Sequence, residues 1–111
     1  MPTSCNIVIV DDHPFIIEGY KNAIKSYSSQ YEFTISQANN CKSAYEIITS
    51  AAKPFDIAFF DISMPAYEEK NIFSGEDLAQ LVKKVMPACK VVLLTMHTEL
   101  IKINNIIKTI N

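Results

Sequence analysis

Arginine is missing from the sequence: all ten basic residues are lysines, and twelve acidic residues give a net charge of −2. Arginine is the side chain best suited to bidentate contacts with phosphates and with guanine, and a negative charge disfavours approach to a phosphate backbone. A nucleic-acid-binding role for these 111 residues alone is therefore disfavoured. Any contact with DNA would have to come from a separate domain.

Signals for membranes or secretion are missing as well. The longest apolar runs are far shorter than the roughly 20 residues of a membrane-spanning helix, and the N-terminus has no basic segment followed by an apolar stretch and a cleavage site. The cysteines Cys5, Cys41 and Cys89 are odd in number and form no C-x-x-C pair, which favours free thiols over disulfides or zinc. We expect a cytoplasmic protein with no membrane contact.

No repeat, low-complexity tract or linker divides the chain. Its 49% hydrophobic and 20% charged residues are typical of a folded protein and argue against a disordered tail. We therefore expect one folded domain over residues 1–111.

The apolar pattern switches regularly between strand-like runs and helix-like stripes. Strands are predicted at 6–10, 31–38, 55–60 and 90–95. Each is followed by helical spacing, which begins at Pro14, after Asn39-Asn40, at the capping-box pattern Ser74-Gly-Glu-Asp77, and after Thr98. This alternation predicts an α/β fold with a parallel sheet and right-handed crossovers.

Oxygen-bearing side chains stand where the predicted strands end. Asp11 and Asp12 follow the first strand, Asp61 the third, and Thr95 the fourth. The carboxyl ends of the strands of a parallel α/β sheet are where functional groups collect. Three neighbouring carboxylates would repel one another unless a cation held them ionised, and oxygen ligands favour Mg²⁺. The pattern indicates a phosphoryl-transfer site.

Each of these residues also has a plain structural interpretation. An Asp-Asp pair often caps a helix, an aspartate before Met-Pro fits a turn, and threonine is a common strand former. Three separate strand ends would each need such an unrelated structural reason. One shared functional site explains all of these residues together. His13 and His97 lie beside the site in sequence, but a histidine that follows a carboxylate is usually solvated, so neither is expected to be a ligand.

Three motifs resemble the receiver domain of bacterial two-component response regulators. They are Ile-Val-Asp-Asp-His-Pro-Phe at 9–15, Phe-Phe-Asp-Ile-Ser-Met-Pro at 59–65 and Val-Val-Leu-Leu-Thr at 91–95. The Asp-Asp-His-Pro start with Glu18-Gly19 is similar to the branch with a C-terminal LuxR-type helix-turn-helix, the NarL/FixJ-like transcription factors. The resemblance implies a flavodoxin-like, three-layer α/β/α fold around a parallel sheet.

The resemblance also implies a role for each site residue. Asp61 would accept a phosphoryl group from a sensor histidine kinase or phosphotransfer protein. Asp11, Asp12, Asp61 and the main-chain carbonyl of Ser63 would hold Mg²⁺, and Thr95 would be the switch hydroxyl. Transcription would be controlled through a separate DNA-binding output domain, with dimerisation on phosphorylation and no turnover of a free substrate.

Two departures from the family pattern stand out. The family's lysine at the end of a fifth strand would fall a few residues past Asn111, so we expect four of the family's five β-α units here, with the output domain outside the sequence. Residues 66–74 lengthen the usual short connection after Pro65. They are either a tolerated surface insertion or a flap whose Tyr67 or Phe73 screens Asp61 or helps a kinase to dock.

Two other functions stay open at this point. One is a Mg²⁺-dependent phosphatase with an aspartate nucleophile, as in the haloacid dehalogenases, although Ser63 stands where that class carries its second aspartate. The other is a receiver-like interaction module that is never phosphorylated.

Overall fold

Strands and helices alternate along the chain in the computed structural model, which describes residues 3–26 and 31–94. The elements are β1 (Thr3–Val10), α1 (Pro14–Ser26), β2 (Tyr31–Ala38), α2 (Cys41–Ser50), β3 (Ile57–Asp61), the 3₁₀ turn η1 (Glu68–Lys70), α3 (Gly75–Val85) and β4 (Lys90–Leu94). For the described residues, the order of strands and α-helices agrees with the prediction, the ends of β1 and β3 differ by a few residues, and η1 was not predicted.

The four described strands form one parallel sheet in the order β2-β1-β3-β4. Ile7 to Val10 of β1 pair with Ile57 to Phe60 of β3, so the two central strands run side by side to the same edge. The predicted parallel α/β fold is confirmed.

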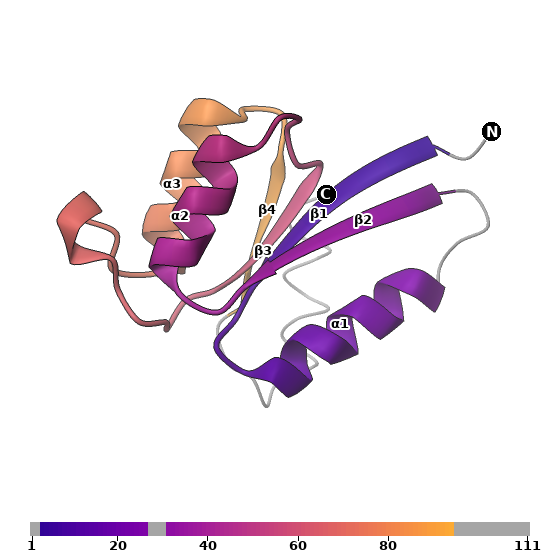
Figure 1. Ribbon diagram of the computed structural model, residues 1–111, viewed down its shortest axis with the longest axis horizontal. Coiled ribbons are helices and arrows are strands. Elements are labelled where there is room, and N and C mark those ends of the chain that lie inside the picture. The colour runs from indigo at the N-terminus through magenta and orange to yellow at the C-terminus, as the bar shows by residue number, and fades with distance from the viewer. Residues whose placement is uncertain (1–2, 27–30, 95–111) are drawn as a thin grey trace.

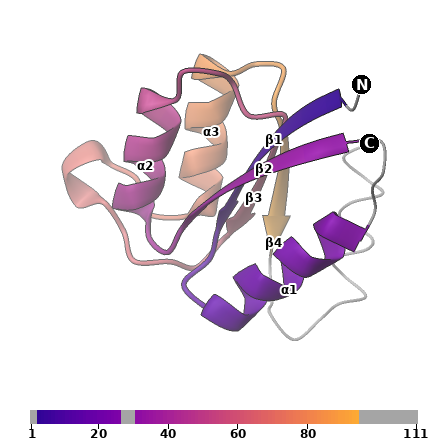
Figure 2. The same ribbon diagram turned by 45° about the vertical axis from the view of Figure 1, so that its right-hand side comes forward.

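Helices cover both faces of the sheet, and Figures 1 and 2 show α2 and α3 together on one face with α1 on the other. The central strands are apolar on both sides for this reason. Val8, Val10, Ala58 and Phe60 pack in the core beneath α2 and α3. The alternate residues pack with α1, and they include Ile7, Ile9, Phe59 and Val92. The three-layer arrangement is therefore present in the described residues.

Two helix starts follow the sequence signals, and a third departs from them. Pro14 is the first residue of α1, and the Asn40 side chain caps α2 by accepting a hydrogen bond from the Ser43 N–H at 2.8 Å. Ser74 precedes α3 as predicted but makes no side-chain cap. Asp77 instead accepts a hydrogen bond from the Phe73 N–H at 2.8 Å, so the predicted capping box is wrong in its details.

Residues 66–74 form a small folded unit attached to α2. Tyr67 and Ile72 form an antiparallel bridge around η1, and the tight return uses Asn71 with φ of 57°. The side chain of Ile72 is buried in the core, and the Tyr67 ring packs edge-on against Tyr45 of α2 at 5.6 Å. The connection is a packed element and not a loose loop.

Several expectations concern residues outside the described ranges. These are the helix expected after Thr98, the end of the fourth predicted strand at Thr95, and His97. Within residues 3–26 and 31–94, no helix is long and apolar enough to cross a membrane.

Candidate functional site

The parallel register of β1 and β3 brings Asp11 and Asp61 to the same edge of the sheet. Val10 and Phe60 are the last paired residues, and each aspartate follows directly in sequence. Both carboxylate side chains are fully buried. Main-chain hydrogen bonds anchor both positions: the Asp11 N–H donates to the Ala38 carbonyl, and the Ile62 N–H to the Leu94 carbonyl, each at 3.1 Å.

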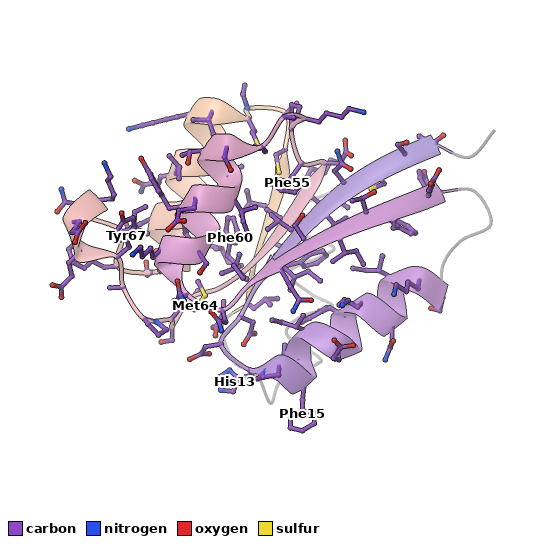
Figure 3. The ribbon with its side chains drawn as sticks, viewed as in Figure 1. His13, Phe15, Phe55, Phe60, Met64 and Tyr67 are labelled. Atoms are coloured by element: carbon purple, nitrogen blue, oxygen red, sulfur yellow. The ribbon has the colours of Figure 1, made fainter. Side chains whose placement is uncertain are left out.

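Asp12 and His13 complete the cluster from the turn between β1 and α1. The imidazole Nδ1 of His13 lies 2.9 Å from Oδ1 of Asp11 and 2.8 Å from Oδ1 of Asp12. One potential ligand atom from each of Asp11, Asp12, His13 and Asp61 can be chosen so that all lie within 4.8 Å of one another. Figure 3 shows His13 at this end of the sheet, beside the first turn of α1.

The charges of the cluster act on His13. Its hydrogen bond with Asp11 raises its pKa above the ordinary value, burial partly opposes this, and the negative charges of Asp12, Asp11 and Asp61 add to the rise. The imidazole is thus drawn toward its cationic form by the acidic groups that surround it.

Of the two remaining predicted site residues, Ser63 lies next to Asp61 and Thr95 lies outside the described residues. The main-chain N–H of Ser63 donates to Oδ1 of Asp61 at 3.2 Å, so the turn after β3 folds back onto the carboxylate. Ser63 therefore lies beside Asp61, and the role of its carbonyl as a metal ligand stays a prediction. Thr95 lies just past the last described residue of β4, and its position relative to Asp61 stays a prediction.

Gly75 also contacts the site, although its sequence pattern indicated only the start of a helix. A Cβ at this position would lie 2.2 Å from the carbonyl oxygen of Asp61 and 2.9 Å from its carbonyl carbon. The Gly75 N–H donates to the Ile62 carbonyl at 3.1 Å. The missing side chain therefore lets the first turn of α3 pack directly on the backbone of Asp61. A glycine at a predicted helix N-terminus is the only signal that the sequence offered.

Tyr20 lies on the α1 side of the sheet, below the acidic edge. Its ring stacks on Phe59 at 5.5 Å, and its hydroxyl oxygen is buried with no hydrogen-bond partner among the described residues. Burial, with the negative charges of Asp11 and Asp61, raises the pKa of Tyr20 to about 12. The phenol is therefore neutral at ordinary pH.

A surface hollow of about 410 Å³ opens beside Asp12. Its lining residues are Asp12, Asn39, Asn40, Lys42, Pro65 and Ala66. Of the cluster, Asp12 is the residue that lines the hollow, so a small polar group in it would meet the Asp12 side chain first. The Tyr67 ring does not close it in the way a flap would, because that ring packs against α2, and in Figure 3 Tyr67 lies well away from His13.

The donor set fits a hard divalent cation. Three carboxylates from two strand ends meet in a site where two of them are fully buried, and oxygen ligands of this kind suit Mg²⁺. A bound cation would offset the mutual repulsion of the carboxylates.

Comparison with known proteins identifies the family. The model of the response regulator receiver domain matches residues 7–109, which is nearly the whole sequence. The chain belongs to this family. Receiver domains are signalling switches that work through a phosphorylated aspartate and bind Mg²⁺ at an acidic pocket, and the cluster of Asp11, Asp12 and Asp61 is consistent with such a pocket.

Solved structures agree with this receiver domain in fold. RcsB from Salmonella typhimurium is 18% identical with a TM-score of 0.66, and the match covers 96% of this chain and 50% of that one. A receiver domain protein from Clostridium thermocellum is 23% identical over 95% of this chain and 75% of its own, with a TM-score of 0.66. The signal receiver domain of NarL from Mycobacterium tuberculosis is 23% identical over 95% of this chain and 79% of its own, with a TM-score of 0.63. These likenesses confirm the flavodoxin-like fold.

The receiver domain spans about half the length of the RcsB chains that it matches. No curated protein matches the sequence.

Proposed function

We propose that this receiver domain is a phosphorylation-dependent switch in which Asp61 accepts a phosphoryl group from a sensor histidine kinase or a phosphotransfer protein. The observation that supports this most strongly is the register of β1 and β3, which brings the buried Asp61 carboxylate to the same edge of the sheet as Asp11 and Asp12.

Asp61 would act as the nucleophile. One of its carboxylate oxygens attacks the phosphorus of a phosphohistidine, a P–O bond forms as the P–N bond breaks, and the released imidazole takes up a proton from solvent. The hydrogen bond from the Ser63 N–H to Oδ1 restricts rotation of the carboxyl group. Contact between α3 and the Asp61 backbone at Gly75 fixes the strand end that carries it.

Asp11, Asp12, Asp61 and the main-chain carbonyl of Ser63 would hold the Mg²⁺ ion. When bound, the ion supplies positive charge that offsets the charge of the transferred phosphoryl oxygens. Thr95 would donate its hydroxyl to a phosphoryl oxygen and so couple the modification to the segment that follows β4.

The output would be transcriptional. Solved structures of RcsB include complexes with DNA and RcsB dimers bound to DNA. Together with the Asp-Asp-His-Pro start, these neighbours support the LuxR-type branch for this chain, with DNA contacts made by a separate C-terminal domain, dimerisation on phosphorylation, and a cytoplasmic location. The receiver sequence itself has no arginine and a net negative charge, which agrees with DNA contacts being made by another domain.

Labelling by a small phosphodonor tests the assignment. The purified protein is incubated with radiolabelled acetyl phosphate with and without Mg²⁺. We expect Mg²⁺-dependent label in the wild-type protein and none in Asp61→Asn, because an amide cannot act as the nucleophile. Asp56→Asn is the matched control: Asp56 lies at the opposite end of the same strand, where its carboxylate accepts a hydrogen bond from the Asn6 N–H.

Label that survives Asp61→Asn would refute the acceptor assignment. A wild-type protein that takes up no label while Mg²⁺ is bound would favour the interaction module. Sustained release of inorganic phosphate from many donor molecules per protein would favour the phosphatase.

A further inference from the structure

The imidazole of His13 occupies a place in the acidic cluster that Mg²⁺ chemistry does not require. We propose that His13 is an additional ligand, through Nδ1, for divalent first-row transition metal ions, which would bind at a mixed nitrogen and oxygen centre where Mg²⁺ uses the oxygen ligands alone. The inference rests on the proposed function, because it assumes that Asp11, Asp12 and Asp61 hold a cation.

The spacing of the candidate ligand atoms matches the edges of a coordination octahedron. Two neighbouring ligand atoms at about 2.1 Å from an octahedral ion are about 3.0 Å apart, and opposite ones about 4.2 Å. Nδ1 of His13 lies 2.9 Å from Oδ1 of Asp11 and 2.8 Å from Oδ1 of Asp12. The four atoms of the cluster all lie within 4.8 Å of one another. The His13 and Asp12 side chains are 49% and 36% exposed, which leaves room for small rotations toward an ion.

The backbone holds His13 in this position. Its main-chain N–H donates to Oδ1 of Asp11 at 2.8 Å, and its carbonyl accepts the first hydrogen bonds of α1 from Ile16 and Ile17 at 3.0 and 3.3 Å. Pro14 begins the helix directly afterwards. Hydrogen bonds thus fix the backbone on both sides of His13, and its Nδ1 lies against the carboxylates of Asp11 and Asp12. The side chain of Phe15 instead points out from the start of α1 and is exposed (Figure 3).

The chemistry of the ligand atoms determines which ions would bind more tightly because of His13. Imidazole nitrogen is a good ligand for cobalt, nickel and zinc ions, whereas Mg²⁺ prefers carboxylates, carbonyls and water. Mg²⁺ would therefore use the oxygen atoms alone and leave His13 as a hydrogen-bonding neighbour. A transition metal ion would bind Nδ1 in its unprotonated form, through the nitrogen lone pair.

Binding of Co²⁺ and Mg²⁺ tests the inference in the purified protein. Isothermal titration calorimetry compares wild type with His13→Phe, which keeps a ring of similar size and removes both nitrogens. We expect Co²⁺ affinity to fall about tenfold or more in His13→Phe and Mg²⁺ affinity to change by less than about twofold. His97→Phe, which removes the other histidine of the chain, is the matched control and should leave both affinities unchanged.

Proton NMR of the Co²⁺ complex gives a readout that does not depend on affinity. The ring N–H proton of a coordinated imidazole is shifted far outside the normal spectral range by the unpaired electrons of the metal. We expect such a signal in wild type and in His97→Phe and its loss in His13→Phe. Persistence of the signal in His13→Phe, or an unchanged ratio of Co²⁺ to Mg²⁺ affinity, would overturn the inference.

Asp12→Asn separates this inference from the proposed function. If Asp12→Asn weakens both ions while His13→Phe weakens neither, the acidic centre holds the cation and His13 is not a ligand. If Asp12→Asn weakens neither ion, the assignment of Asp12 as a metal ligand in the proposed function is wrong, and the His13→Phe titration and NMR spectrum still decide the role of His13.

Discussion

Gly75 shows how much a single position contributes to the placement of the acceptor. A methyl group there would lie 2.2 Å from the main-chain carbonyl oxygen of Asp61. Neither a Cβ nor a main-chain oxygen can move away by a side-chain rotation. Either α3 or the end of β3 must then move, and the end of β3 carries Asp61.

Gly75→Ala should therefore destabilise the domain by about 1–3 kcal/mol, as overpacking of a tight contact does. It should also slow labelling of Asp61. Urea unfolding and the labelling rate measure the two effects. Gly19 provides the matched control, because it lies in the exposed middle of α1 with nothing within 4 Å of an added Cβ. Gly19→Ala should be neutral or stabilising by up to about 1 kcal/mol. Equal effects of the two substitutions would show that the close approach is unimportant.

Some of the site contacts can be predicted from the sequence, and others cannot. Asp11, Asp12 and Asp61 are predictable because strand ends in a parallel sheet converge whatever the details of packing. The contact of Gly75 with Asp61 depends on how closely α3 approaches the sheet, and the contact of His13 depends on a side-chain rotamer. Neither quantity is encoded in the local pattern of apolar residues, so both needed the structure.

The packing of residues 66–74 was likewise not predictable from the sequence. Their length indicated an insertion, but the sequence did not indicate where it packs. The structure attaches it to α2 through the Tyr67 and Tyr45 rings, with the Lys70 ammonium 5.7 Å from the centre of the Tyr45 ring. The aromatic partner lies 22 residues earlier in the sequence, and a contact of that range has no periodic signal.

Tyr67→Ala should destabilise the domain by about 1–3 kcal/mol, because it removes a partly buried ring and an edge-on aromatic contact. Glu69→Ala, at an exposed position of η1, should change the stability by less than about 0.5 kcal/mol. Unfolding in urea measures both variants. Labelling of Asp61 by acetyl phosphate should stay within about twofold of wild type in each, since neither side chain screens the site. Faster labelling of Tyr67→Ala would restore the flap interpretation.

At the scale of the whole molecule, the order β2-β1-β3-β4 places β2 and β4 at the two edges of the described sheet, and these two strands differ in polarity. The exposed positions of β2 include Glu32, Thr34 and Gln37. The sequence of β4 is Lys-Val-Val-Leu-Leu, with one charge, and within the described part of the chain no strand pairs with its outer edge. An apolar strand with an unpaired edge is a template for pairing with another chain.

We therefore predict that these 111 residues associate through β4 in a way that depends on concentration and not on phosphorylation. Light scattering after size exclusion would show a mass that rises with protein concentration, equally in wild type and Asp61→Asn and without a phosphodonor. The dimer proposed for the phosphorylated protein behaves differently, because it needs both the donor and Asp61. A monodisperse monomer that melts cooperatively at all concentrations would contradict edge pairing. A dimer that appears only with acetyl phosphate, and never in Asp61→Asn, would instead assign all self-association to the phosphorylated switch.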